Sequence, residues 1–275
     1  MPQYQITHQT SYHFDEPVSE LEINACLSPR DVAGQISEFH HVISVPMPVK
    51  QKQDLDCFGN IRTHLFYTKA LQRIDITAVS TVAVSSQVQR NNNQLNGPQW
   101  HELYSQEELN VTASLVADYA HECTEGITTT VELVNAVMQK IYRDFVYDLN
   151  ATSVSTSLNE VLTKKRGVCQ DFARAMIAIL QLNNIPACYV SGYLFCGENT
   201  RGTARQAASH AWVMVDIPQQ GWVGVDPTNN QWVNEDYVVL AWGRDYADII
   251  PVEGVLKKDY FQRLNVSVTI EKLDH

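Results

Sequence analysis

The sequence lacks the patterns that mark nucleic-acid and membrane binding. Its densest basic cluster is only Lys164-Lys165-Arg166, and the 275 residues carry a formal net charge of −11. A negative field repels nucleic acid and anionic lipid, so we expect neither as a partner. No apolar run approaches the length of a membrane span, and no secretory signal pattern is visible at the start. We therefore expect a cytoplasmic protein that binds no membrane.

Signatures of cofactors and metals are missing as well. There is no phosphate-binding loop, no dinucleotide fingerprint, and no CxxC or HExxH pair. The six cysteines are scattered, and a chain of this length does not need disulfides to stabilise its core. Without such a pair, a zinc site built from Cys169, Cys188, Cys196 and His210 is not favoured. We predict free thiols, no cofactor and no metal.

The chain does have 44% hydrophobic residues, arranged first with the period of strands. Between Tyr4 and Val84, short runs rich in Val, Ile, Thr, Tyr and Phe are separated by Pro, Gly and Asp, and residues 74–81 alternate in polarity. Several strands without intervening helices predict a β-sandwich. The Asn-rich segment 86–98 predicts a linker, so we assign residues 1–90 to an N-terminal β-sandwich domain and residues 91–275 to a second domain.

Helical spacing follows the linker and later returns to the period of strands. Apolar residues recur at intervals of three and four over 115–120, 131–141 and 172–180. Ser157 and Glu160 have the spacing of a capping box, which predicts the start of another helix. Pro186 prevents the helix over 172–180 from continuing. Runs over 189–195, 210–217 and 222–225 predict strands, the last two joined as an antiparallel hairpin by the turn at 218–221. The second domain is therefore predicted to be α+β.

One cysteine, one histidine and one aspartate stand where a thiol catalyst needs them. Cys169 begins the helix predicted to end near Asn183, and the unpaired N–H groups and dipole of a helix N-terminus stabilise a thiolate. His210 and Asp226 lie nine residues before and seven residues after Gln219 in the hairpin turn. This near-symmetry predicts that they lie within about one register step of each other. We interpret Cys169 as a nucleophile, His210 as its base and Asp226 as the group that orients the histidine.

Taken singly, each of these three residues fits a structural role, and it is their shared order that indicates a site. The surrounding sequence resembles the transglutaminase-like superfamily in three blocks: Gly167-Val168-Cys169-Gln170-Asp171-Phe172-Ala173, Ser209-His210-Ala211-Trp212-Val213 and Val225-Asp226-Pro227-Thr228-Asn229. It is also similar to bacterial members that are grouped as cysteine proteases, in Asp56-Cys57-Phe58-Gly59-Asn60 and Gly243-Arg244-Asp245-Tyr246. The resemblance implies a β-rich N-terminal domain and a Cys-His-Asp triad on a papain-like core, with helices packed on an antiparallel sheet.

The resemblance further implies acyl transfer through a thioester. We expect hydrolysis of an amide in a peptide, a protein or a small molecule, since nothing signals selective admission of an amine. Cross-linking of glutamine to amines and a non-catalytic binding module on this fold are the alternatives. The backbone N–H of Cys169, with a side chain from Tyr147 or Gln170, is the candidate oxyanion hole. Arg174 stands where many relatives have His and Cys188 where Arg is usual, so substrate preference stays open, as does the oligomeric state.

Overall fold

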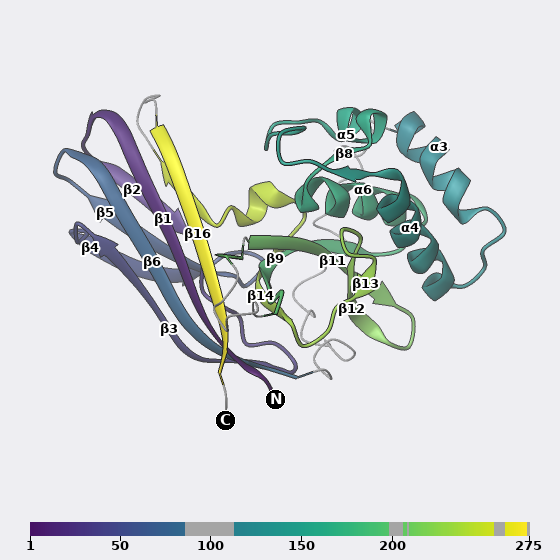
Figure 1. Ribbon diagram of the computed structural model, residues 1–275, viewed down its shortest axis with the longest axis horizontal. Helices are drawn as coiled ribbons and strands as arrows, with labels where there is room; N and C mark the ends of the chain where they lie inside the picture. The colour runs from purple at the N-terminus through teal and green to yellow at the C-terminus, as the bar shows by residue number, and fades with distance from the viewer. Residues whose placement is uncertain (86–112, 198–205, 208, 256–261, 274–275) are drawn as a thin grey trace.

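The computed structural model of the protein describes residues 1–85, 113–197, 206–207, 209–255 and 262–273. The predicted linker, residues 86–98, lies outside these ranges. Figure 1 shows two layers of strands on one side of the molecule and, next to them, a sheet covered by helices. The predicted α+β class, with an N-terminal β region before a helical core, is confirmed.

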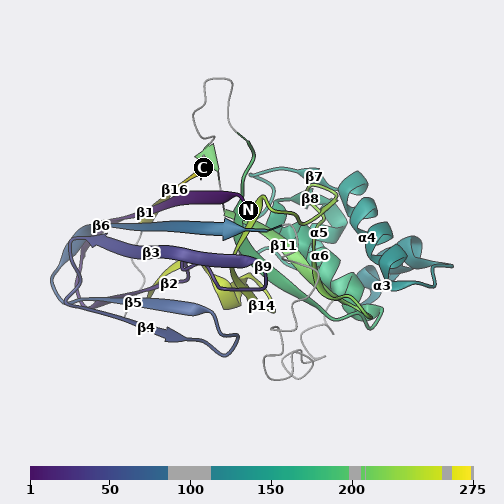
Figure 2. The ribbon, with the colours of Figure 1, turned by 90° about the horizontal axis from the view of Figure 1, so that it is seen from below.

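Two antiparallel sheets form the N-terminal sandwich, and Figure 2 shows them as separate layers. The first runs in the order β10 (Gln206–Ala207), β16 (Gln262–Leu273), β1 (Gln3–Val18), β6 (Leu71–Val84) and β3 (Gln35–Val45). The second runs in the order β15 (Val252–Val255), β2 (Leu21–Ala25), β5 (Ile61–Tyr67) and β4 (Lys50–Leu55). Along β6, Ile74, Ile76 and Ala78 are buried and the residues between them are not, as the alternating pattern predicts. Apolar side chains from both sheets form the core between the layers.

The end of the chain returns to this sandwich. β16 pairs with β1 from Phe14 opposite Gln262 to Gln3 opposite Leu273, and β15 pairs with β2. The second domain predicted at 91–275 therefore contains strands that complete both sheets of the first. The division near residue 90 stays a prediction, because residues 86–112 are not described.

The second part is a five-stranded antiparallel sheet with helices on one face. Its order is β13 (Gln231–Trp232), β12 (Gly221–Asp226), β11 (Ser209–Ile217), β9 (Ala187–Leu194) and β14 (Tyr237–Gly243). The helices are α3 (Ala113–Thr124), α4 (Thr130–Asp144), α5 (Leu158–Lys164) and α6 (Cys169–Leu182), and α6 packs on β11 and β9. Ser157 caps α5 by accepting the N–H of Glu160 at 3.3 Å, as the sequence predicts.

A single apolar core joins the two parts. Tyr4 and Ile6 of β1 and Val268 of β16 belong to the same buried cluster as Tyr193 of β9 and Trp212 of β11. The sandwich and the helix-covered sheet therefore bury apolar surface against each other rather than meeting only through a linker. None of the described helices has the length and apolar composition needed to cross a membrane.

Candidate active site

The start of α6 is built so that Cys169 becomes its first residue. One oxygen of the buried Asp171 carboxylate, Oδ2, accepts the Val168 N–H at 2.9 Å and the Thr152 hydroxyl at 2.6 Å. This satisfies a backbone donor at the helix start and fixes the turn that carries Cys169. Gly167 is needed because a Cβ there would lie 2.3 Å from the same oxygen. Cys169 itself is only 8% exposed.

A short parallel bridge brings Tyr147 to the same place. β7 (Val146–Tyr147) pairs with β8 (Arg166–Gly167), so Tyr147 lies opposite the glycine two positions before Cys169. Its ring packs edge-on against Phe172 with centroids 6.2 Å apart, while 52% of the residue stays exposed. Partial burial and the nearby negative charge of Cys169 raise the pKa of Tyr147.

The hairpin of β11 and β12 forms as predicted and brings His210 to Asp226. His210 Nε2 lies 2.7 Å from Asp226 Oδ2. The register pairs Val213 with Val225, so the two residues are offset by two positions rather than by the predicted single step. An offset of two keeps both side chains on one face of the sheet, whereas one step would have separated them. The Cys169 thiol lies close enough to His210 to raise the pKa of the histidine.

Asp226 is fully buried, and both oxygens of its carboxylate accept hydrogen bonds. Besides His210, Oδ2 accepts from the Tyr237 hydroxyl and from Asn229 Nδ2, each at 2.7 Å. The other oxygen, Oδ1, accepts the backbone N–H groups of Thr228 at 2.8 Å and Asn229 at 3.3 Å. Neither Asn229 nor Tyr237 is predicted from the sequence to hydrogen-bond to Asp226. Asn229 was visible in the block that follows Asp226, but Tyr237 lies on another strand and has no local signal.

The charges of this site support one another. Burial alone would lower the pKa of His210, but the hydrogen bonds and negative charges of Asp226 and Cys169 raise it well above its ordinary value. Burial alone would raise the pKa of Asp226, but its hydrogen bonds and the charge of His210 lower it. The favoured state is therefore an imidazolium beside a carboxylate.

The second oxyanion candidate, Gln170, lines a cavity. This cavity has a volume of about 180 Å³, and Tyr246 lies on it as well. Arg174 lines the same cavity, where its Nε lies 3.2 Å from Asp245 Oδ2 and its Nη1 donates to the Thr156 carbonyl at 3.0 Å. The oxyanion roles of Tyr147 and Gln170 stay predictions.

Cys188, the other departure from the family pattern, lies away from the site. It is fully buried in β9, opposite Met214, and burial raises the pKa of its thiol. Within the ranges that the structure describes, no group of three or more His, Cys, Asp or Glu side chains is placed to hold a metal ion.

Known proteins match the chain along most of its length. Residues 4–83 match the bacterial transglutaminase-like N-terminal region, and residues 117–227 match the transglutaminase-like superfamily. An uncharacterized protein of Mycobacterium tuberculosis is 33% identical over 276 residues, covering 92% of this chain and 87% of the relative, and one from Mycobacterium leprae is 26% identical over 283 residues, covering 98% of each. The crystal structure of a "putative cysteine protease" from Cytophaga hutchinsonii has the same fold, with a TM-score of 0.78 at 21% identity, and covers 100% of this chain and 91% of its own. The chain belongs to the transglutaminase-like superfamily.

Proposed function

We propose that the protein is a cysteine-dependent enzyme that hydrolyses a peptide or amide bond, with Cys169, His210 and Asp226 as its triad. The observation that carries the proposal is the 2.7 Å contact between His210 Nε2 and the buried Asp226 carboxylate, next to Cys169, which is the first residue of α6 and raises the pKa of that histidine. The raised pKa of His210 supports an imidazolium that stabilises a thiolate at Cys169. A helix N-terminus adds to that stabilisation.

The reaction follows from these protonation states. The Cys169 thiolate attacks the carbonyl carbon, and a C–S bond forms as the carbonyl π electrons move to oxygen. His210 then donates its proton to the amide nitrogen, the C–N bond breaks, and the amine leaves a thioester behind. Water attacks the thioester while His210 accepts its proton. The C–S bond breaks, and the carboxylic acid leaves.

The negative oxygen of each tetrahedral intermediate needs donors. The backbone N–H of Cys169 is available, since the first residues of a helix have no acceptor within it. Tyr147 supports a second donor better than Gln170 does, because the charge of Cys169 acts on Tyr147, whereas Gln170 lines the cavity that also contains Arg174. We therefore assign the side-chain role to the Tyr147 hydroxyl.

Water, rather than an amine, is the proposed second nucleophile. Tyr147, whose pKa the charge of Cys169 raises, is 52% exposed, so solvent reaches the residues around the buried thiol. Selective transfer to an amine requires a site that keeps water out. We also propose a cytoplasmic location, which is supported by the six free cysteines, because thiols stay reduced there.

The test is a screen of peptide and amide libraries against the wild type, Cys169→Ala and a control, Cys196→Ala, which removes an exposed thiol. Mass spectrometry distinguishes a new carboxylate from an amine-joined product. We expect carboxylate products from the wild type and the control and none from Cys169→Ala. Amine-joined products would favour cross-linking, and product from Cys169→Ala at the wild-type rate would overturn the proposed mechanism.

A further inference from the structure

The outer edge of β14 is covered by two buried side-chain amides from the sandwich. Gln35 Nε2 donates to the Val239 carbonyl at 2.8 Å, and Gln35 Oε1 accepts the Val239 N–H at 2.7 Å. Asn60 repeats this pattern on Trp242, donating at 2.8 Å and accepting at 3.0 Å. Each amide supplies the donor and the acceptor that a neighbouring strand would supply. The sandwich therefore ends the catalytic sheet at this edge.

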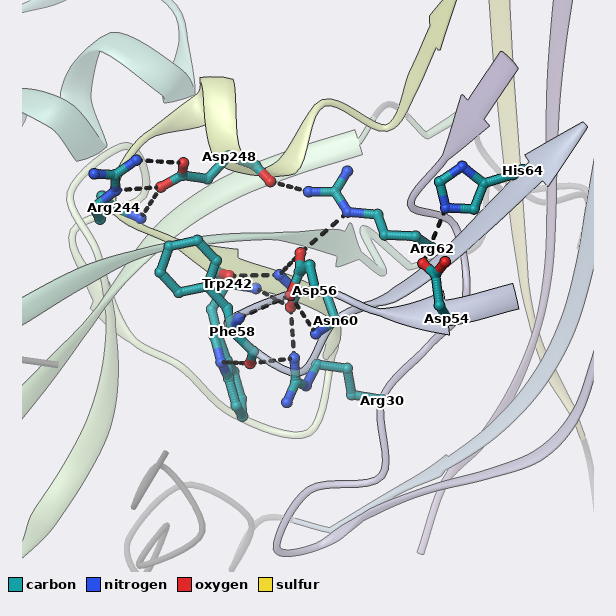
Figure 3. A network of polar contacts seen from close by, with 10 residues as sticks. All are labelled: Arg30, Asp54, Asp56, Phe58, Asn60, Arg62, His64, Trp242, Arg244 and Asp248. Atoms are coloured by element: carbon teal, nitrogen blue, oxygen red, sulfur yellow. Dashed lines mark hydrogen bonds and ion pairs between the residues drawn. The ribbon is translucent and has the colours of Figure 1, made fainter. Parts of the chain in front are cut away.

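A polar network inside the sandwich fixes the loop that presents Asn60 (Figure 3). Asp56 Oδ1 accepts the N–H groups of Phe58 and Asn60 at 2.9 and 2.8 Å, and its Oδ2 accepts from the Asn60 amide at 2.9 Å and from Arg62 Nε at 3.1 Å. Gly59 has a φ of +72°, which favours glycine over residues with a Cβ. The loop is therefore set in one conformation before it meets β14.

The same network reaches the short 3₁₀ helix η2 (Tyr246–Ile249) that follows β14. Arg62 Nη2 donates to the backbone carbonyl of Asp248, as Figure 3 shows. Arg244 binds the carboxylate of Asp248 through two hydrogen bonds of 2.9 Å. Asp248 is thus held through its backbone by the sandwich and through its side chain by the segment itself. The sandwich thus anchors residues 243–250 from outside the segment.

This anchored segment forms one wall of the cavity that Gln170 and Asp171, the two residues after Cys169, also line. Asp245, Tyr246 and Ile250 lie on that wall, and Gln170 and Arg174 of α6 lie opposite. The two walls are joined by the Arg174–Asp245 ion pair, in which Nε and Oδ2 lie 3.2 Å apart. Gln170 directly follows Cys169, so the cavity begins one residue along the chain from the thiol.

We propose that this cavity is the subsite for substrate groups next to the cleaved bond, and that Arg62 and Asn60 of the sandwich are the positioning residues that hold its wall. The N-terminal domain is then a part of the active site rather than a separate binding module. The inference rests on the proposed function for the claim that substrate occupies the cavity. The anchoring of η2 can be measured without any catalysis.

Hydrogen–deuterium exchange tests the anchoring. Arg62→Met removes the donor to Asp248, Arg62→Lys keeps a cation there, and Arg73→Met is the matched control, since Arg73 pairs with Asp75 in the same domain but at the exposed surface. Loss of a hydrogen bond from a charged donor predicts exchange over 243–250 that is faster by about tenfold or more in Arg62→Met. We expect a smaller increase in Arg62→Lys and none in Arg73→Met. Exchange within about twofold of wild type in both Arg62 variants overturns the proposal.

Labelling of Cys169 tests the cavity, with two probes of different size. Iodoacetamide needs only the thiol, whereas benzyloxycarbonyl-phenylalanyl-alanyl chloromethyl ketone must also place its peptide part beside it. In Arg62→Met we expect the chloromethyl ketone to react about tenfold more slowly, with the iodoacetamide rate changed by less than about twofold. Equal changes for both probes overturn the role of the cavity. If iodoacetamide fails to label wild-type Cys169 rapidly, the proposed function fails, and exchange still decides whether Arg62 anchors η2.

Discussion

Replacing Asp226 with Asn keeps the size of the side chain and removes its charge. In the native site Oδ2 accepts three hydrogen bonds, from His210, Tyr237 and Asn229, and Oδ1 accepts two backbone N–H groups. An amide has one acceptor oxygen, so its NH₂ group faces donors in either orientation. At least two hydrogen bonds are therefore lost around a fully buried group.

The expected destabilisation follows from these contacts. Breaking a buried ion pair by removing one partner costs about 3–5 kcal/mol, in line with two lost hydrogen bonds to a charged group at about 1.5–3 kcal/mol each. The imidazolium of His210 loses its carboxylate as well. Losing one hydrogen bond to a charged group destabilises the imidazolium by about 1.5–3 kcal/mol. Since about 1.4 kcal/mol equals a tenfold change, we expect alkylation of Cys169 to be about ten- to hundredfold slower at pH 7.

Urea unfolding and the rate of iodoacetamide labelling at Cys169 measure these two effects. Asp216→Asn is the matched control, because Asp216 lies at the turn end of the same hairpin, opposite Trp222. We expect the control to change either quantity little. A folded Asp226→Asn protein that labels Cys169 within about threefold of the wild-type rate would refute the role given to the carboxylate.

The effect of Asp226→Asn on the free energy of unfolding also depends on pH, because both His210 and Asp226 have shifted pKa values. The pKa of His210 is raised, so its contribution is complete below the ordinary value of 6.5 and is lost as pH rises through the raised value. The pKa of Asp226 is lowered, so its contribution is complete above the ordinary value of 3.8 and is lost as pH falls through the lowered value. The difference in unfolding free energy between wild type and Asp226→Asn should therefore be largest between these two values.

Two further substitutions test the surroundings of the site. Gly167→Ala places a Cβ 2.3 Å from Asp171 Oδ2 and displaces that carboxylate from Val168 and Thr152. We expect urea unfolding to show a destabilisation of about 2–4 kcal/mol. A loss below about 1 kcal/mol would contradict the role given to Asp171 in this turn. Burial lowers the pKa of His8 to about 4, so the wild type should lose stability as pH falls from 6.5 toward 4, by about 3 kcal/mol from this group. In His8→Gln, the unfolding free energy should change less with pH between pH 6.5 and 4 than in the wild type. An unchanged slope would contradict burial of a neutral His8.

Much of the site was predictable because its signals are local. A helix that begins at Cys169 and a hairpin that carries His210 and Asp226 follow from apolar periods and one turn, and both form. The cap at Ser157 follows in the same way. These features depend on residues that are neighbours along the chain, so spacing carries the information.

The parts that escaped prediction depend on contacts between distant residues. β15 and β16 join the first domain although they come last in the chain, and no local pattern names their partners. β4 is exposed at every position and polar except at Leu55, so it has no alternation to detect. Tyr237 reaches Asp226 although β9 lies between its strand, β14, and the hairpin of β11 and β12. Such positions become visible only when the sheet order is known.

Cys169 is proposed to be an activated thiol. The order in which the native cysteines react with an alkylating reagent shows whether it is one. Cys57 and Cys196 are exposed and serve as internal references, whereas Cys169 is 8% exposed. A limiting dose of iodoacetamide near pH 7, followed by peptide mass spectrometry, ranks the three thiols in one sample. Labelling of Cys169 ahead of both references is predicted, because His210 and the start of α6 stabilise its thiolate. Labelling of Cys57 and Cys196 first, in the order of their exposure, would contradict it.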